Sequence, residues 1–340
     1  MSQRQRLQLF RAALAALTFL LLLAGCMGPP PQVATAPARV VKRVPEPLPS
    51  SASSPSLAFA TSSALAAPVM AAGEPVTTFD GQRLETAFYA PVSLAVKNDR
   101  FDLIIHFHGK HQTAIDALDQ SGLPAALISV DLGVGSRVYR GAYDEAGSLE
   151  RLIAFAERSL HETGRLPNAR VGRIAISAWS AGYGAARLIL SRPAEAVRVD
   201  ALLLVDALFA DWDAKGARAR SASMDALAPT VAFAARATRA ERLFVLTHTA
   251  IAQSAYAGAP DCADALLRHF DVVKESAPLS ARPFGGAPTY AADLEDLHLR
   301  GFDGKTVAEH AEQYRAMGTL HYLELRRYWE RDANAAVRRR

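Results

Sequence analysis

Cysteine is scarce in this sequence: only Cys26 and Cys262 occur among its 340 residues. Two cysteines exclude the disulfide framework of a small secreted scaffold and also a zinc site built from cysteines. If Cys26, near the N-terminus, is modified, Cys262 has no partner within the chain. We therefore expect Cys262 to be a free thiol that is buried or half buried.

A strong excess of one charge is also missing. The chain has 38 Lys and Arg residues against 34 Asp and Glu residues, a net charge of +4. Several basic residues lie at the two ends of the chain, where a solvated tail explains them better than a phosphate-binding face does. The sequence has no glycine-rich phosphate loop of the nucleotide or dinucleotide type. We therefore expect no nucleic-acid partner and no cofactor.

The N-terminal apolar run, residues 12–23, is too short for a comfortable transmembrane helix, which needs about 20 residues. A basic segment precedes it, and it ends in Leu-Ala-Gly-Cys at Cys26. This order is typical of a secretory signal. Its end resembles the bacterial lipobox, in which cleavage precedes a cysteine that becomes lipid-modified. We expect a lipoprotein signal peptide over residues 1–25.

The lipobox resemblance implies a location in the bacterial cell envelope. Several acyl chains on Cys26 would anchor the protein stably to a membrane, because a single chain binds only marginally. Met27, rather than an aspartate, follows the cysteine. By resemblance to Gram-negative lipoproteins, this favours the outer membrane. An ordinary secretory signal with a chance cysteine is the alternative.

Proline, alanine and serine dominate residues 26–73. Such a segment buries too little apolar surface to offset the entropy lost on ordering. We expect a semi-extended, lipid-anchored linker that holds a domain, residues 74–335, off the membrane.

Apolar strand-like and helical segments alternate in that domain. We expect strands at 101–107, 125–130, 171–177, 201–205, 242–246 and 294–302, with helices at 149–160, at 224–240 and from 306 onward. This order predicts an α/β fold with a mostly parallel central sheet and helices on both faces. Polar residues follow several strands, where α/β sheets bind their ligands.

The most informative of these strand ends carries Ser180. An apolar strand precedes this serine, a helical segment follows it, and the local pattern is A-x-S-x-G, with Ala178 and Gly182 at the outer positions. A nucleophile elbow has this strand–turn–helix context and needs small neighbours around a strained serine. We therefore interpret Ser180 as a nucleophile, although a plain turn residue or helix cap is the alternative.

With an acid and a histidine downstream of Ser180, residues 74–329 resemble the α/β-hydrolase superfamily. The order nucleophile, acid, histidine is that of this superfamily. The resemblance implies a serine hydrolase that cleaves an ester or amide of a small-molecule or lipid-like acyl substrate through an acyl-enzyme. It places the histidine after the last strand, which favours His310, with His321 as the fallback. It places the acid at Asp206, with Asp211 second.

The same resemblance implies an oxyanion hole built from backbone N–H groups, as acyl transfer requires. One donor is Ala181, and the other comes from Gly109 or Lys110. Polar and aromatic residues beside these positions are candidates for substrate binding: His108, Trp179 and Tyr143. Plain loop packing explains these residues equally well.

Two hypotheses from other classes remain at this point. His106, His108 and His111 resemble the H-x-H-x-D-H motif of metallo-β-lactamase-like hydrolases, but Lys110 replaces the aspartate. A cation beside a metal ion is unfavourable and removes a ligand. The other alternative is a catalytically inactive envelope-binding module, because Ala178 departs from the usual glycine.

Overall fold

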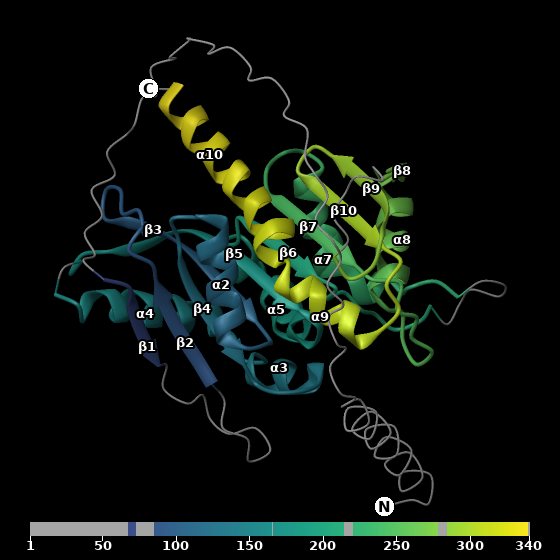
Figure 1. Cartoon of the computed structure of the whole chain (residues 1–340), viewed down its shortest axis with the longest axis horizontal. Helices are drawn as coiled ribbons and strands as arrows, with labels where there is room; N and C mark the ends of the chain where they lie inside the picture. Colours follow the sequence, from purple (N-terminus) through teal and green to yellow (C-terminus); the bar gives the residue numbers. More distant parts are fainter. Residues whose placement is uncertain (1–66, 73–84, 165, 214–219, 278–283, 339–340) are drawn as a thin grey trace, which may run out of the picture. The chain divides into compact units, whose positions relative to one another are not determined.

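The computed structural model describes residues 67–72, 85–164, 166–213, 220–277 and 284–338 (Figure 1). The expected signal peptide, Cys26 and most of the expected linker lie outside these residues. Among the residues described, no helix has the length and apolarity to cross a membrane.

A mixed sheet of ten strands forms the centre of the described chain, in the order β1-β2-β4-β3-β5-β6-β7-β10-β9-β8. The six central strands run parallel to one another. They are β4 (Ala126–Asp131), β3 (Arg100–Phe107), β5 (Arg170–Trp179), β6 (Ala201–Val205), β7 (Leu243–His248) and β10 (Leu297–Phe302). Most of their residues are buried, as expected when helices cover both faces. The predicted α/β fold with a mostly parallel sheet is confirmed.

Antiparallel strands extend the sheet at both edges. They are β1 (Val69–Ala72) and β2 (Glu85–Ala90) at one edge, and β9 (Pro288–Leu294) and β8 (Glu275–Ser276) at the other. The strand β1 lies inside the segment that we assigned to the linker, so the sheet begins before residue 73. Its pairing with β2 is non-local, and an Ala-rich tetrapeptide gives no periodic signal for it.

The last predicted strand, residues 294–302, is wrong in its first part. The chain turns at Glu295, whose φ is 53°, so β9 and β10 form an antiparallel hairpin. Apolar and polar residues alternate over too few positions there to show where one strand ends and the next begins.

Helices cover the two faces of the sheet (Figure 1). One apolar core lies under α4 (Ser148–His161), α5 (Tyr183–Ser191), α7 (Met224–Ala237) and α8 (Ala259–Phe270). A second core lies under α2 (His111–Ser121), α9 (Val307–Arg315) and α10 (Leu323–Arg338). The short helices α3 (Ser136–Ala142) and α6 (Pro193–Ala196) lie in the loops. Cys262, on α8, is a fully buried free thiol, as expected.

Candidate active site

Ser180 occupies a strained turn between β5 and α5. Its φ is 47°, in the left-handed region that residues with a Cβ rarely adopt. A short 3₁₀ turn, η1 (Ser180–Gly182), leads from it into α5. A Cβ at Gly182 would overlap the carbonyl oxygen of Phe107, so only glycine fits there. Ala178 is fully buried in the apolar core, and its methyl group is accommodated. The local geometry is that of a nucleophile elbow.

A histidine and a carboxylate meet beside this turn. His310 Nδ1, on α9, lies 2.7 Å from Asp206 Oδ2, directly after β6. The carboxylate side chain is 5% exposed and the imidazole 18% exposed, so the acid lies deeper than the base. Asp211 is exposed and has no such contact. The structure thus brings together the first choices for acid and base, 104 residues apart in the sequence.

The fallback histidine, His321, does not join this pair. It is fully buried in the π-helical segment η2 (Gly318–Tyr322), where its Nε2 contacts the hydroxyl of Thr247 at 2.9 Å.

A threonine that the sequence analysis did not select holds the carboxylate. Thr249 donates from its hydroxyl to Asp206 Oδ2 at 2.6 Å and from its N–H to Oδ1 at 3.2 Å. The next N–H, of Ala250, donates to the carbonyl of Gly304 in the loop before α9 at 2.7 Å. The residues after β7 therefore fix both the acid and the approach to the helix that carries His310. The only sign in the sequence that Thr249 has this role is its hydroxyl at the end of an expected strand.

The loop after β3 supplies unbonded backbone donors. His108 and Gly109 have φ angles of 77° and 104°. Neither the N–H of Gly109 nor that of Lys110 has a hydrogen-bond partner in the described part of the chain. Ala181 lies in the first turn of η1, where N–H groups have no partner within the helix. The three expected oxyanion donors are therefore available for a ligand.

The aromatic residues of the site are mostly packed against one another. The Trp179 ring stacks on His108 at a centroid distance of 4.9 Å, on Tyr314 at 4.7 Å and on His310 at 4.9 Å. Its Nε1 donates to the carbonyl of His310 at 3.3 Å. Trp179 therefore braces the helix of His310, in addition to any substrate contact.

One expected substrate contact is not available. Tyr143 is only 4% exposed and packs edge-on against Phe107 in the apolar core, with ring centroids 5.0 Å apart. An aromatic residue in a polar loop can turn inward, and the sequence pattern carries no sign of this.

His108 contacts the protein rather than open solvent. Its Nδ1 lies 2.8 Å from the hydroxyl of Tyr139 and 3.8 Å from Asp131 Oδ1. The interaction with His108 lowers the pKa of Asp131 to about 2, so a carboxylate stands behind this imidazole at neutral pH. The side chain of His108 is 13% exposed, which leaves one edge for a ligand.

The three histidines considered as a metal site have separate partners. His106 contacts Ser177, His108 contacts Tyr139, and His111 Nδ1 lies 2.9 Å from the Ser129 hydroxyl. Within the described residues, no three His, Cys, Asp or Glu side chains gather in a metal-binding arrangement. The geometry therefore gives the metal hypothesis no ligand set.

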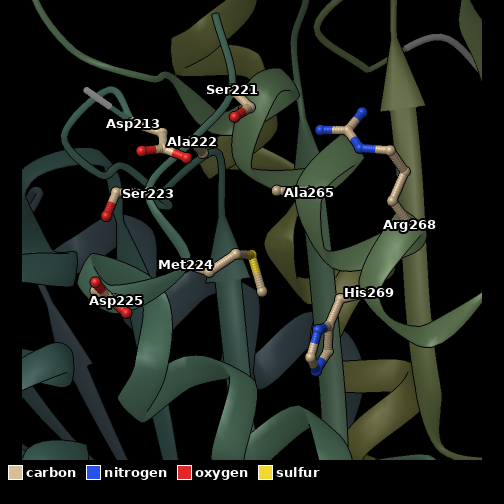
Figure 2. A pocket seen from close by; sticks show the side chains of 9 residues that line it. All are labelled: Asp213, Ser221, Ala222, Ser223, Met224, Asp225, Ala265, Arg268 and His269. Carbon is tan, nitrogen blue, oxygen red and sulfur yellow. The ribbon is translucent and has the colours of Figure 1, made fainter. Parts of the chain in front are cut away.

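A pocket of about 420 Å³ lies elsewhere, between the start of α7 and the end of α8 (Figure 2). It is lined by Asp213, Ser221, Ala222, Ser223, Met224, Asp225, Ala265, Arg268 and His269. None of these residues belongs to the candidate site. Ser223 caps α7, accepting a hydrogen bond from the N–H of Ala226, which gives this part of the lining a structural role.

Taken together, the fold is α/β with a mostly parallel sheet, and the serine turn, the acid and the histidine follow in the order expected from the α/β-hydrolase resemblance. Neither a protein-family model nor a curated protein sequence matches the chain.

Several solved structures are similar to this chain at low identity. One is a ferulic acid esterase, 12% identical, with 76% of this chain and 99% of the other covered at a TM-score of 0.41. An S-formylglutathione hydrolase from Agrobacterium tumefaciens is 13% identical, with 76% of this chain and 95% of the other covered at a TM-score of 0.40. An arylesterase is 17% identical over 44% of this chain at 0.28, and the chain spans about half of it (47%). The candidate site therefore rests on its own geometry.

Proposed function

We propose that this protein is a serine hydrolase that cleaves an ester of a small-molecule or lipid-like acyl substrate through an acyl-enzyme on Ser180. The observation that carries the proposal is the strained serine turn at the same sheet edge as the hydrogen-bonded His310–Asp206 pair. Trp179, the residue before the serine, is in ring contact with His310, so the turn and the base are neighbours.

In the proposed acylation step, Ser180 Oγ attacks the carbonyl carbon and His310 Nε2 accepts the hydroxyl proton. No described residue is hydrogen-bonded to that nitrogen, which leaves it available. The buried Asp206 accepts from Nδ1–H, which fixes the tautomer and stabilises the imidazolium that forms. The N–H groups of Ala181 and of Gly109 or Lys110 stabilise the oxyanion.

The tetrahedral intermediate then collapses. The C–O bond to the leaving alcohol breaks, and the imidazolium gives its proton to the departing oxygen. In deacylation, His310 takes a proton from water, the resulting hydroxide attacks the acyl carbon, and Ser180 leaves with the proton returned. In each step the proton moves between His310 and a reacting oxygen. The positive charge on the imidazolium and the negative charge on the oxyanion therefore form and disappear together.

We also propose that the protein acts at the cell envelope, anchored through acyl chains on Cys26 and oriented to the outer membrane. The lipobox-like end of the N-terminal apolar run supports this. Growth with labelled palmitate should label the wild-type protein and leave Cys26→Ala unlabelled. Label retained in the variant would remove the anchor from the proposal and leave the hydrolase part intact.

The test of the hydrolase is a panel of p-nitrophenyl esters, from acetate to long acyl chains, with wild-type protein and Ser180→Ala. We expect turnover by the wild type and a loss of several orders of magnitude in the variant, with unchanged unfolding behaviour. A fluorophosphonate should label Ser180 alone. Substantial residual turnover in Ser180→Ala would contradict the mechanism, and failure of the folded wild type to react with any probe would favour an inactive binding module.

A further inference from the structure

His106 is a buried polar residue in an otherwise apolar strand. It is fully buried in β3, while Ile104, Ile105 and Phe107 around it are equally buried hydrophobic residues. The metal hypothesis named it, but the described residues provide no metal-binding group of side chains. The proposed mechanism gives it no step. A buried imidazole needs hydrogen-bond partners to offset the loss of water, and its partners here define what it does.

The two ring nitrogens of His106 have different partners. Nε2 lies 2.8 Å from the carbonyl oxygen of His108, and Nδ1 lies 2.9 Å from the hydroxyl of Ser177 on β5. Because a carbonyl oxygen only accepts, the proton must be on Nε2, and Nδ1 accepts from the serine. Burial lowers the pKa of His106 to about 3, so the ring is neutral and keeps this tautomer at neutral pH.

The bond to the carbonyl of His108 sets the orientation of one peptide group. The C=O of His108 and the N–H of Gly109 belong to the same planar trans peptide and point in opposite directions. Holding the oxygen against the buried imidazole therefore directs the N–H away from it. The serine turn η1 adjoins this loop, because Gly182 packs on the carbonyl of Phe107.

A tyrosine from α9 secures the rest of the loop. The Tyr314 ring stacks on His106, with centroids 5.3 Å apart and planes at 9°, and its hydroxyl donates to the carbonyl of Lys110 at 2.8 Å. The ring also fills the space that a side chain at Gly109 would need. The carbonyls of His108 and Lys110 are thus both held from the buried side, while the N–H groups of Gly109 and Lys110 have no partner among the residues that the structure describes.

We propose that His106 is a positioning residue that holds the His108–Gly109 peptide with its N–H facing the candidate site, so that Gly109 is a preorganised oxyanion donor. This inference rests on the proposed hydrolase function. Its consequence is specific: the imidazole acts on the transition state, in which the oxyanion forms, and has little effect on substrate binding.

Three variants separate this role from general stability. His106→Leu removes the donor and suits the apolar surroundings. His106→Gln keeps an N–H donor on a side chain of similar reach. Ser129→Ala is the matched control, because Ser129 faces His106 across the β3–β4 pair, is buried and contacts a different imidazole, His111.

The first readout needs no turnover. His108 is the only histidine in the sequence that is followed by glycine. Protein with ¹³C-carbonyl histidine and ¹⁵N-glycine therefore gives a single HNCO signal, from this peptide. We expect His106→Leu to shift or broaden that signal, and His106→Gln and Ser129→Ala to keep it near the wild-type position. An unchanged signal in folded His106→Leu would overturn the inference, whether or not the protein is a hydrolase.

The second readout is hydrolysis of p-nitrophenyl acetate. In His106→Leu we expect kcat to fall by about 10²-fold, the lower end for loss of one oxyanion donor, with KM nearly unchanged. His106→Gln should recover most of the loss, and Ser129→Ala should stay within about threefold of wild type. An equal loss of kcat in Ser129→Ala would reduce His106 to a structural residue. A wild type without turnover would reject the proposed function, and the HNCO signal would still decide the inference.

Discussion

At the scale of single residues, Asp206, the proposed acid, is held by Thr249 as well as by His310. Asp206 Oδ2 accepts from both His310 and the hydroxyl of Thr249, while Oδ1 accepts from the Thr249 backbone. Its φ of 46° is also strained. Several bonds to one carboxylate fix its plane, and the plane fixes the imidazole that bonds to it.

Thr249→Val tests this support with a nearly isosteric change. We expect kcat for an activated ester to fall by about 10- to 150-fold, because a hydrogen bond to a charged group contributes about 1.5–3 kcal/mol. Thr249→Ser keeps the hydroxyl and should stay close to wild type. A loss of kcat in Thr249→Ser with none in Thr249→Val would show that the β-branched shape matters and the hydroxyl does not.

The acid itself should matter far more. Asp206→Asn leaves the shape intact but favours the wrong imidazole tautomer, so kcat should fall by about 10⁴-fold, as in known Ser-His-Asp triads. Asp211→Asn, at an exposed position without contact to His310, should have no comparable effect. The comparison of kcat for the two variants decides which carboxylate serves the base.

At the scale of elements, a carboxylate from one helix holds the start of another. Glu195, on α6, accepts from the N–H groups of Gly147 and Leu149 at the start of α4, and Arg192 pairs with it at 2.6 Å. Burial raises the pKa of Glu195, but the bonds from Arg192 and these amides lower it more, so its net shift is downward. The charge complements the positive end of α4.

Glu195→Gln should therefore lower the free energy of unfolding by about 2–3 kcal/mol, because Arg192 and an amide are left without a charged partner. Urea titration measures this. The matched control is Glu330→Gln, which removes an exposed ion pair with Arg326 and should cost at most about 0.5 kcal/mol. A similar small loss in both would mean that the buried pair contributes no more than an exposed one.

The sequence predicted some elements and missed others for physical reasons. The central strands are apolar runs bounded by turns, so they could be found. The edge strand β2 pairs with β4, about 40 residues further along the chain, which composition cannot reveal. The edge strand β9 was missed because its hairpin turn at Glu295 lies inside the segment that we expected to be a single strand. Ser180 was recognisable because its strain needs small neighbours. The role of Thr249 and the burial of Tyr143 could not be recognised. The residues next to a hydroxyl or an aromatic ring in the sequence do not indicate which distant group it contacts.

At the scale of the whole molecule, buried imidazoles make stability depend on pH. Burial lowers the pKa of His106 and of His321 to about 3, and it also lowers that of His248. In the unfolded chain these groups titrate near pH 6.5. Between about pH 6.5 and 3 the unfolded state binds more protons than the folded state, so stability is complete above this window and falls as the pH falls through it.

We expect the free energy of unfolding to drop by about 2 kcal/mol for each of His106 and His321 between pH 6.5 and 5. Urea midpoints at pH 7.5 and 5 measure the change. His321→Gln should reduce the drop in the free energy of unfolding by the contribution of one histidine. His269→Gln, at an exposed position, should leave the drop unaltered. A pH dependence that is the same in all three proteins would mean that His321 is not held neutral.

The helix α9 carries both His310 and Tyr314, one turn apart, and both rings rest on Trp179. The proposed proton acceptor and Tyr314, whose hydroxyl holds the loop after β3, are therefore carried by the same helix. If this helix detaches, the two functions are lost together, and no partly competent form remains. Inactivation by heat or denaturant should consequently follow one transition, ahead of or together with the melting of the sheet, with no plateau of reduced activity.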